Sequence, residues 1–80
     1  MNLIWVTSAD YVGDYKLRLT FNNGEVKTFD GRDYVMSHPL FEALRQPSSY
    51  QQFELDGWTV SWQQGRLDIA PEYLYSHAVA

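Results

Sequence analysis

Hydrophobic and polar positions alternate most clearly between residues 15 and 30, where two extended runs flank Asn22-Asn23-Gly24. A period of two is typical of a strand with one buried face, and Asn-Gly is a strong short-range signal for a hairpin turn. The sequence therefore predicts a β-hairpin whose two-residue turn is Asn23-Gly24. The predicted register pairs Phe21 with Val26, Thr20 with Lys27, Leu19 with Thr28 and Arg18 with Phe29.

This register gives the predicted hairpin one buried face and one exposed face. The buried face carries Tyr15, Leu17, Leu19, Phe21, Val26 and Thr28. The exposed face carries Lys16, Arg18, Thr20, Lys27 and Phe29. A shift of one residue would move every side chain of a strand to the other face, so we expect the hydrophobic pattern to specify the register.

The N-terminal region also has β character. Leu3–Ser8 is rich in residues that favour strands and predicts the first strand of the sheet. Ala9–Asp14 contains two aspartates and a glycine, which predict a turn or an irregular connection before the hairpin.

A second hairpin is predicted around Asp56-Gly57, which is another favoured two-residue turn. The predicted pairs are Leu55 with Trp58 and Phe53 with Val60. The stripe of Trp58, Val60 and Trp62 is interpreted as core, because Phe53 and Leu55 need the same face covered. Leu67–Ile69 predicts a further short extended segment.

Two regions lose the period of two and predict helices. Arg32–Gln52 predicts a helix, a break and a short helix, with Pro39 in a first turn after Ser37 or His38 as the cap, and a break at Pro47. Pro71–His77 predicts a two-turn helix, because proline suits the first helical position. Val79-Ala80 is expected to fray.

The predicted fold class is α+β. We expect a small, mostly antiparallel sheet built from two β-hairpins plus an N-terminal strand, with two or three short helices, in one domain over residues 1–80. The sequence suggests no linker, internal repeat or low-complexity segment. A core this small is marginal unless densely packed, so we expect the three Trp, six Tyr and four Phe residues to fill it, or self-association to complete it.

Charge and composition narrow the function classes. The net charge of −4 argues against non-specific binding to nucleic acid or to anionic membranes, which both favour excess Lys and Arg. The absence of cysteine removes disulfides and thiolate metal sites and fits a cytoplasmic location. No leader is evident, and no apolar run approaches the roughly 20 residues that cross a bilayer.

Candidate catalytic and metal-binding residues are few. His38 and His77 are the two histidines, and a metal site would need them to converge with carboxylates such as Asp30 or Asp33. A helix cap or a helix-end cation is the favoured interpretation of each histidine.

The carboxylate pairs near turns favour local backbone hydrogen bonds over acid–base chemistry. These pairs are Asp30 with Asp33 and Asp10 with Asp14. The sequence contains neither a nucleophile elbow nor a glycine-rich phosphate loop. We therefore predict no catalytic residue, no metal ligand and no cofactor.

The predicted exposed face of the first hairpin is the candidate partner-binding site. This face holds half of the six basic side chains together with one aromatic residue: Lys16, Arg18, Lys27 and Phe29. They would form a docking patch for an acidic protein segment, with Phe29 as an apolar anchor and nucleic acid as the second option. The alternative is an ordinary solvated sheet face with Phe29 covered by a neighbouring loop.

Four stretches resemble an uncharacterised bacterial family known as domain of unknown function 2442. They are LRLTFNNGEVKTFD at 17–30, FEALRQP at 41–47, TVSW at 59–62 and LDIAPEYLY at 67–75. The resemblance covers nearly the whole chain and is specific as a combination. It implies a small α+β domain with an antiparallel sheet, no established catalytic activity and no assigned functional residues.

The resemblance also implies a context for the domain. Some relatives attach it to a helix-turn-helix module, for which we expect no room here, and others are encoded beside a small uncharacterised protein in an arrangement like a toxin–antitoxin pair. Many relatives place Asn-Gly after the tryptophan, whereas this chain has Gln63-Gln64-Gly65-Arg66-Leu67, which predicts an altered loop.

These observations favour a non-enzymatic protein-interaction domain. It would be the antitoxin-like or regulatory member of a two-protein bacterial system, with a partner encoded next to it. Homodimerisation through a sheet edge or an aromatic patch is also expected. Two alternatives stay open: a small hydrolase or metal-dependent enzyme in which His38 meets Asp30 or Asp33, and a nucleic-acid-associated regulator that binds through Lys16, Arg18 and Lys27.

Overall fold

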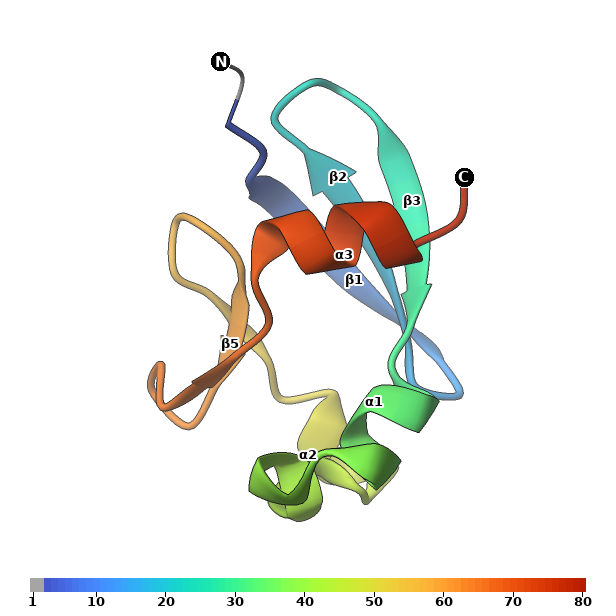
Figure 1. Cartoon of the computed structure of the whole chain (residues 1–80), viewed down its shortest axis with the longest axis vertical. Helices are drawn as coiled ribbons and strands as arrows, with labels where there is room; N and C mark the ends of the chain where they lie inside the picture. Colours follow the sequence, from blue (N-terminus) through green and yellow to red (C-terminus); the bar gives the residue numbers. More distant parts are fainter. Residues whose placement is uncertain (1–2) are drawn as a thin grey trace.

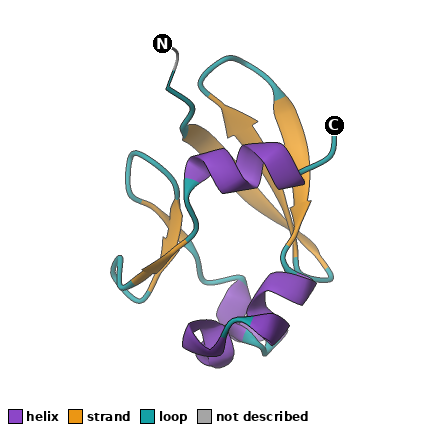
Figure 2. Cartoon of the chain, viewed as in Figure 1, coloured by secondary structure: helices purple, strands orange, loops and turns teal. Residues whose placement is uncertain are grey.

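The chain forms two three-stranded antiparallel sheets joined by short helical segments (Figures 1 and 2). The structure is a computed structural model and describes residues 3–80. The elements are, in order, β1 (Val6–Gly13), β2 (Lys16–Phe21), β3 (Val26–Asp30), α1 (Arg32–Ser37), the 3₁₀ helix η1 (Pro39–Leu44), α2 (Pro47–Tyr50), β4 (Glu54–Leu55), β5 (Val60–Trp62), β6 (Leu67–Asp68) and α3 (Pro71–His77). The predicted α+β class, with hairpins and an N-terminal strand, is confirmed.

The first strand is longer and lies later in the chain than predicted. β1 continues through the region predicted as a turn, and the chain reverses at Asp14-Tyr15. Both residues have left-handed backbone angles, with φ of 54° and 64°. The aspartates misled the prediction, because Asp10 lies in β1 opposite Arg18, with which it forms an exposed ion pair at 3.6 Å.

The β2–β3 register differs from the prediction by one residue. The observed pairs include Leu17 with Phe29 and Leu19 with Lys27. The loop contains three residues, and Gly24 takes the left-handed position, with φ of 88°, that ends such loops. Asn22 belongs to the loop because its side-chain amide bonds two backbone groups of the N-terminal segment, at 2.8 and 2.9 Å.

This one-residue difference inverts β3 and leaves β2 as predicted. Phe29 is buried at 3% exposure, whereas Val26 is 50% exposed. Lys27 lies on the core side of the sheet, with its ammonium group 3.8 Å from the ring centroid of Tyr75 and donating to the Tyr75 carbonyl at 3.0 Å. A lysine can occupy this position because its aliphatic stem packs while its charge reaches a polar partner.

The register of the second hairpin differs from the prediction by two residues. Leu55 pairs with Val60, not with Trp58, and the chain turns through Gly57, which has φ of 88°. The Asp56 carboxylate accepts backbone N–H groups of the next turn residues at 2.8 and 2.9 Å. The predicted core stripe is correct for Val60 and Trp62 and wrong for Trp58, which lies in the bend before β5 and is 40% exposed.

The predicted helices agree with the structure better than the predicted strand registers do. α3 has the predicted bounds, and residues 32–52 form α1, η1 and α2 with breaks before both prolines. His38 occupies the N-cap position of η1, although its side chain makes no capping hydrogen bond there. The C-terminal prediction is wrong for Val79, which exchanges two backbone hydrogen bonds with Thr28 at 2.7 and 2.9 Å.

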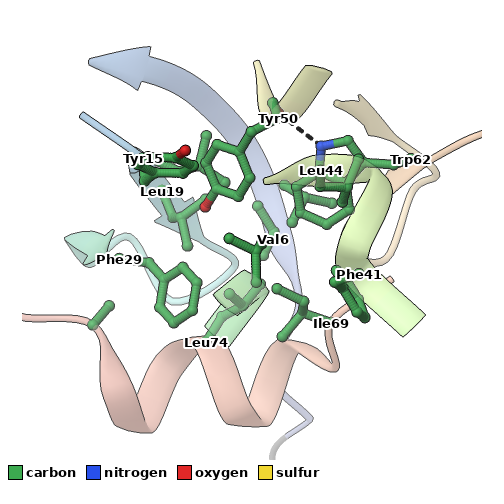
Figure 3. Close-up of a cluster of buried hydrophobic side chains, with 14 of the residues drawn as sticks. Val6, Tyr15, Leu19, Phe29, Phe41, Leu44, Tyr50, Trp62, Ile69 and Leu74 are labelled. Carbon is green, nitrogen blue, oxygen red and sulfur yellow. Dashed lines mark hydrogen bonds between the residues drawn. The ribbon is translucent and has the colours of Figure 1, made fainter. Parts of the chain in front are cut away.

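One cluster of buried side chains connects both sheets and the helices (Figure 3). α3 lies across one face of the β1–β2–β3 sheet and buries Leu74 against it (Figure 1). Trp62 donates its indole N–H to the Tyr50 carbonyl at 2.7 Å, and the two rings are 5.5 Å apart. The Tyr50 hydroxyl is buried and has no hydrogen-bond partner among residues 3–80. Burial is the main reason why the pKa of Tyr50 is raised, so its hydroxyl stays protonated.

The space around the Tyr50 hydroxyl generates a first prediction. A Cβ at Gly31 would lie 2.8 Å from Cζ of Tyr50 and still closer to its hydroxyl oxygen. Gly31→Ala is therefore expected to lower the free energy of unfolding by about 1–3 kcal/mol, as overpacked cores do. Tyr50→Phe removes an unpartnered hydroxyl and is expected to be neutral or slightly stabilising. Urea denaturation of both variants measures these changes.

The double variant and a matched control make this prediction specific. Gly31→Ala combined with Tyr50→Phe is expected to recover part of the lost stability, since the nearest clashing atom is gone. Tyr15→Phe should lose about 1 kcal/mol, because the Tyr15 hydroxyl donates to the Arg45 carbonyl. Equal losses for Tyr50→Phe and Tyr15→Phe would contradict this description of the core.

The pairing of Val79 with Thr28 generates a second prediction. Deleting Val79-Ala80 removes two backbone hydrogen bonds and is expected to lower the free energy of unfolding by about 1–2 kcal/mol. Deleting Ala80 alone is the control and should have little effect. Thermal and urea denaturation of the two truncated proteins test this, and equal stability of both would show that Val79 does not hold β3.

Candidate protein-binding surface

The predicted basic patch is not a single surface. Lys16 and Arg18 lie on the outer face of β2, whereas Lys27 and Phe29 lie on the opposite, helix-covered face. The one-residue register shift is the cause, since it exchanges the faces of β3 alone. Phe29 cannot serve as an exposed anchor, and partner binding by Lys16 and Arg18 stays a prediction.

The histidines are held by their own helices. Nδ1 of His38 lies 2.8 Å from the Tyr34 carbonyl, and Nδ1 of His77 lies 2.9 Å from the Tyr73 carbonyl. Asp30 instead accepts the backbone N–H of Arg32 at 3.1 Å, as expected for a turn aspartate. Within the described residues 3–80, no three His, Asp or Glu side chains are grouped closely enough to hold a metal ion.

Both histidines belong to a six-residue motif that occurs twice in the chain. Residues 33–38 read Asp-Tyr-Val-Met-Ser-His, and residues 72–77 read Glu-Tyr-Leu-Tyr-Ser-His. In each copy the residue after the tyrosine is fully buried, which anchors the helix and turns the tyrosine and the histidine four positions later to one side. The sequence analysis missed this repeat because it is short.

The two copies of the motif meet in space and align four rings. His38 stacks on Tyr34 with centroids 3.9 Å apart, and His77 stacks on Tyr73 at 3.8 Å, both within 15° of parallel. Tyr34 and Tyr73 meet edge to face at 5.2 Å. We call these four side chains, from α1 with its C-cap residue His38 and from α3 (Figure 1), the ring row. Its order is His38, Tyr34, Tyr73, His77.

The ring row combines exposure with firm support. His38, Tyr73 and His77 are exposed and Tyr34 is half-buried. Beneath the row, Phe41 and Phe29, both labelled in Figure 3, contact the tyrosines edge-on at 5.0 to 6.5 Å. Supported rings lose little conformational freedom when a partner covers them.

The hydrogen-bonding state of the ring row follows from its contacts. A carbonyl oxygen can only accept, so Nδ1 of each imidazole carries the hydrogen and Nε2 of the neutral ring is a free acceptor. Burial, followed by repulsion from Tyr73 and Asp68, raises the pKa of Tyr34, so its hydroxyl remains neutral at physiological pH. Each row tyrosine has an acidic neighbour in sequence, since Asp33 and Glu72 directly precede Tyr34 and Tyr73.

An open pocket lies elsewhere, between the helical segment and the β5–β6 loop. Its volume is about 590 Å³, and its polar lining includes Ser49, Gln52, Glu54, Gln63, Gln64 and Arg66. Gln63 and Gln64 both have left-handed backbone angles, with φ of 56°. The lining offers amides and one charge of each sign, which suit a small polar ligand, but no nucleophile beside a histidine base.

Across residues 3–80, no helix has the length and apolar character needed to span a bilayer. Comparison with curated proteins gives no significant match. The fold resembles the crystal structure of the Nitrosomonas europaea ATCC 19718 protein named "Putative DNA Binding Protein NE0471", with a TM-score of 0.79 and 22% sequence identity. The match covers 98% of this chain and 52% of that one, so this chain spans about half the length of that protein.

At 22% identity this likeness shows the fold alone. The family comparison reaches further, because residues 6–80 match the family described as "Protein of unknown function (DUF2442)". That match spans nearly the whole chain and confirms the resemblance that the sequence motifs indicated. The chain belongs to the DUF2442 family.

Proposed function

We propose that this chain is a cytoplasmic, non-enzymatic protein-binding domain, and that the ring row is its binding surface. It acts as the antitoxin-like or regulatory member of a two-protein system whose other member is encoded beside it. The observation that carries this proposal is the alignment of four rings, three of them exposed, with Tyr73 36% exposed at their centre.

Tyrosine-rich, supported surfaces are well suited to bind proteins. Aromatic residues are enriched in the centres of protein interfaces, where they supply large contact areas. The stacking of each histidine on its tyrosine fixes the rings before a partner arrives, which lowers the entropy lost on binding. The same argument does not extend to the open pocket, which is lined mainly by long, flexible polar side chains.

Nucleic acid is a weaker candidate for the partner. Four of the six basic side chains already have partners within the fold: Arg18 with Asp10, Arg32 with Asp14, Lys27 with the Tyr75 carbonyl and Arg45 with the Val35 carbonyl. The net charge of −4 adds long-range repulsion from phosphates. The DNA binding named for the Nitrosomonas protein concerns a chain about twice as long.

The test is co-expression with the protein encoded next to this one, followed by calorimetry on the purified pair. We expect a complex with a dissociation constant at or below the micromolar range. Tyr73→Ala removes the central exposed ring and is expected to weaken binding at least tenfold, about 1.4 kcal/mol, as interface aromatics commonly do. Size-exclusion chromatography of this chain, purified without its partner, shows whether it forms a homodimer.

The control variant is Arg18→Ala, which lies on the outer face of β2 and should leave the affinity unchanged. Thermal denaturation confirms that both variants are folded. No complex at micromolar concentrations would refute the two-protein proposal. A complex weakened by Arg18→Ala and not by Tyr73→Ala would move the binding surface to the outer face of the sheet.

A further inference from the structure

We infer that the ring row recognises arginine and lysine side chains, so that the segment seated on it is a basic segment of a partner protein. This inference rests on the proposed protein-binding function and adds the chemistry of the partner. It reverses the charge expected from the sequence, where a basic patch was predicted to take an acidic segment.

The rings supply the first part of the argument. A cation placed over the face of an aromatic ring is attracted by the ring's electron distribution, with Arg the more frequent partner. The fold already uses this contact twice. Lys27 lies 3.8 Å from the Tyr75 ring centroid, and the Arg32 guanidinium carbon lies 4.9 Å from that of Tyr15. Three rings of the row, those of His38, Tyr73 and His77, belong to exposed residues.

The hydrogen-bonding groups of the row supply the second part. With Nδ1 of each histidine committed to a carbonyl, Nε2 of each neutral imidazole is left as an acceptor. The guanidinium group of arginine carries five donors and no acceptor, and the lysine ammonium carries three donors. The two Nε2 acceptors therefore match the donors of basic side chains.

The charges around the row supply the third part. Asp33 and Glu72 adjoin the two tyrosines in sequence, and Asp68 lies near enough to Tyr34 to contribute to its raised pKa. The three carboxylates belong to α1, α3 and β6. Together with the net charge of −4, they attract a cationic segment and steer it toward the rings.

The experiment uses the full chain and four fluorescein-labelled twelve-residue peptides of one Gly-Ser framework, each with four variable positions. The variable residue is arginine, lysine, glutamine or glutamate. Fluorescence anisotropy is expected to rank the affinities as arginine above lysine, with glutamine and glutamate at least tenfold weaker than arginine. Binding of the arginine peptide is expected to weaken with added salt, since it includes ion pairing.

Matched variants separate the ring row from the charge of the whole protein. Asp68→Asn with Glu72→Gln removes two charges beside the row, and Asp10→Asn with Asp56→Asn removes two charges elsewhere. The first pair is expected to weaken arginine-peptide binding at least fivefold and the second less than twofold. Tyr73→Leu, which keeps an apolar side chain but removes the aromatic ring, should also weaken it at least fivefold.

Equal effects of the two charge pairs would overturn the inference, because they would mean non-specific attraction. Unchanged binding by Tyr73→Leu would overturn it as well. A partner complex that depends on Tyr73, without preference for arginine peptides, would refute only the charge assignment. Arginine-peptide binding with no complex between the two encoded proteins would refute the two-protein proposal and leave the ring row as a site for basic segments.

Discussion

The packing of Tyr50 is the contact on which the rest of the fold depends. Its ring lies 5.5 Å from those of Tyr15 and Trp62, and its carbonyl accepts the indole N–H of Trp62. These partners come from the β1–β2 turn and from β5, so one residue of α2 connects both sheets. Each sheet has three short strands and needs another layer to bury its hydrophobic face. Gly31 allows this contact, because any larger side chain would occupy the space of the tyrosine ring.

Local signals in the sequence predicted the elements better than their pairing. α3 could be predicted to the residue, because a proline begins it and its buried positions repeat within seven residues. The registers could not, because Asn-Gly and Asp-Gly fit loops of more than one length. What selects the longer first loop is Asn22, whose amide bonds the N-terminal segment some 17–19 positions away in sequence. Such a contact is invisible in a pattern of alternating residues.

The candidate surface was harder still to predict. An error of one residue in β3 placed Phe29 outside and Lys27 beside it, and so created a basic patch that the fold does not have. The ring row depends on a tertiary contact between Tyr34 and Tyr73, which are 39 positions apart in the sequence. The repeated Tyr-x-x-Ser-His motif is visible in the sequence, but the contact between its two copies is not. We expected the aromatic residues to fill a small core, but Tyr73 lies instead in the exposed ring row.

The pairing of Val79 with Thr28 has a consequence for solubility. β3 is the last strand of its sheet, and unpaired backbone groups on such a strand can template aggregation with other chains. The C-terminal segment occupies the middle of that edge and leaves no continuous stretch for an incoming strand. The C-terminal segment thereby guards this edge of the sheet against pairing with a strand of another chain, and β1 forms the opposite edge.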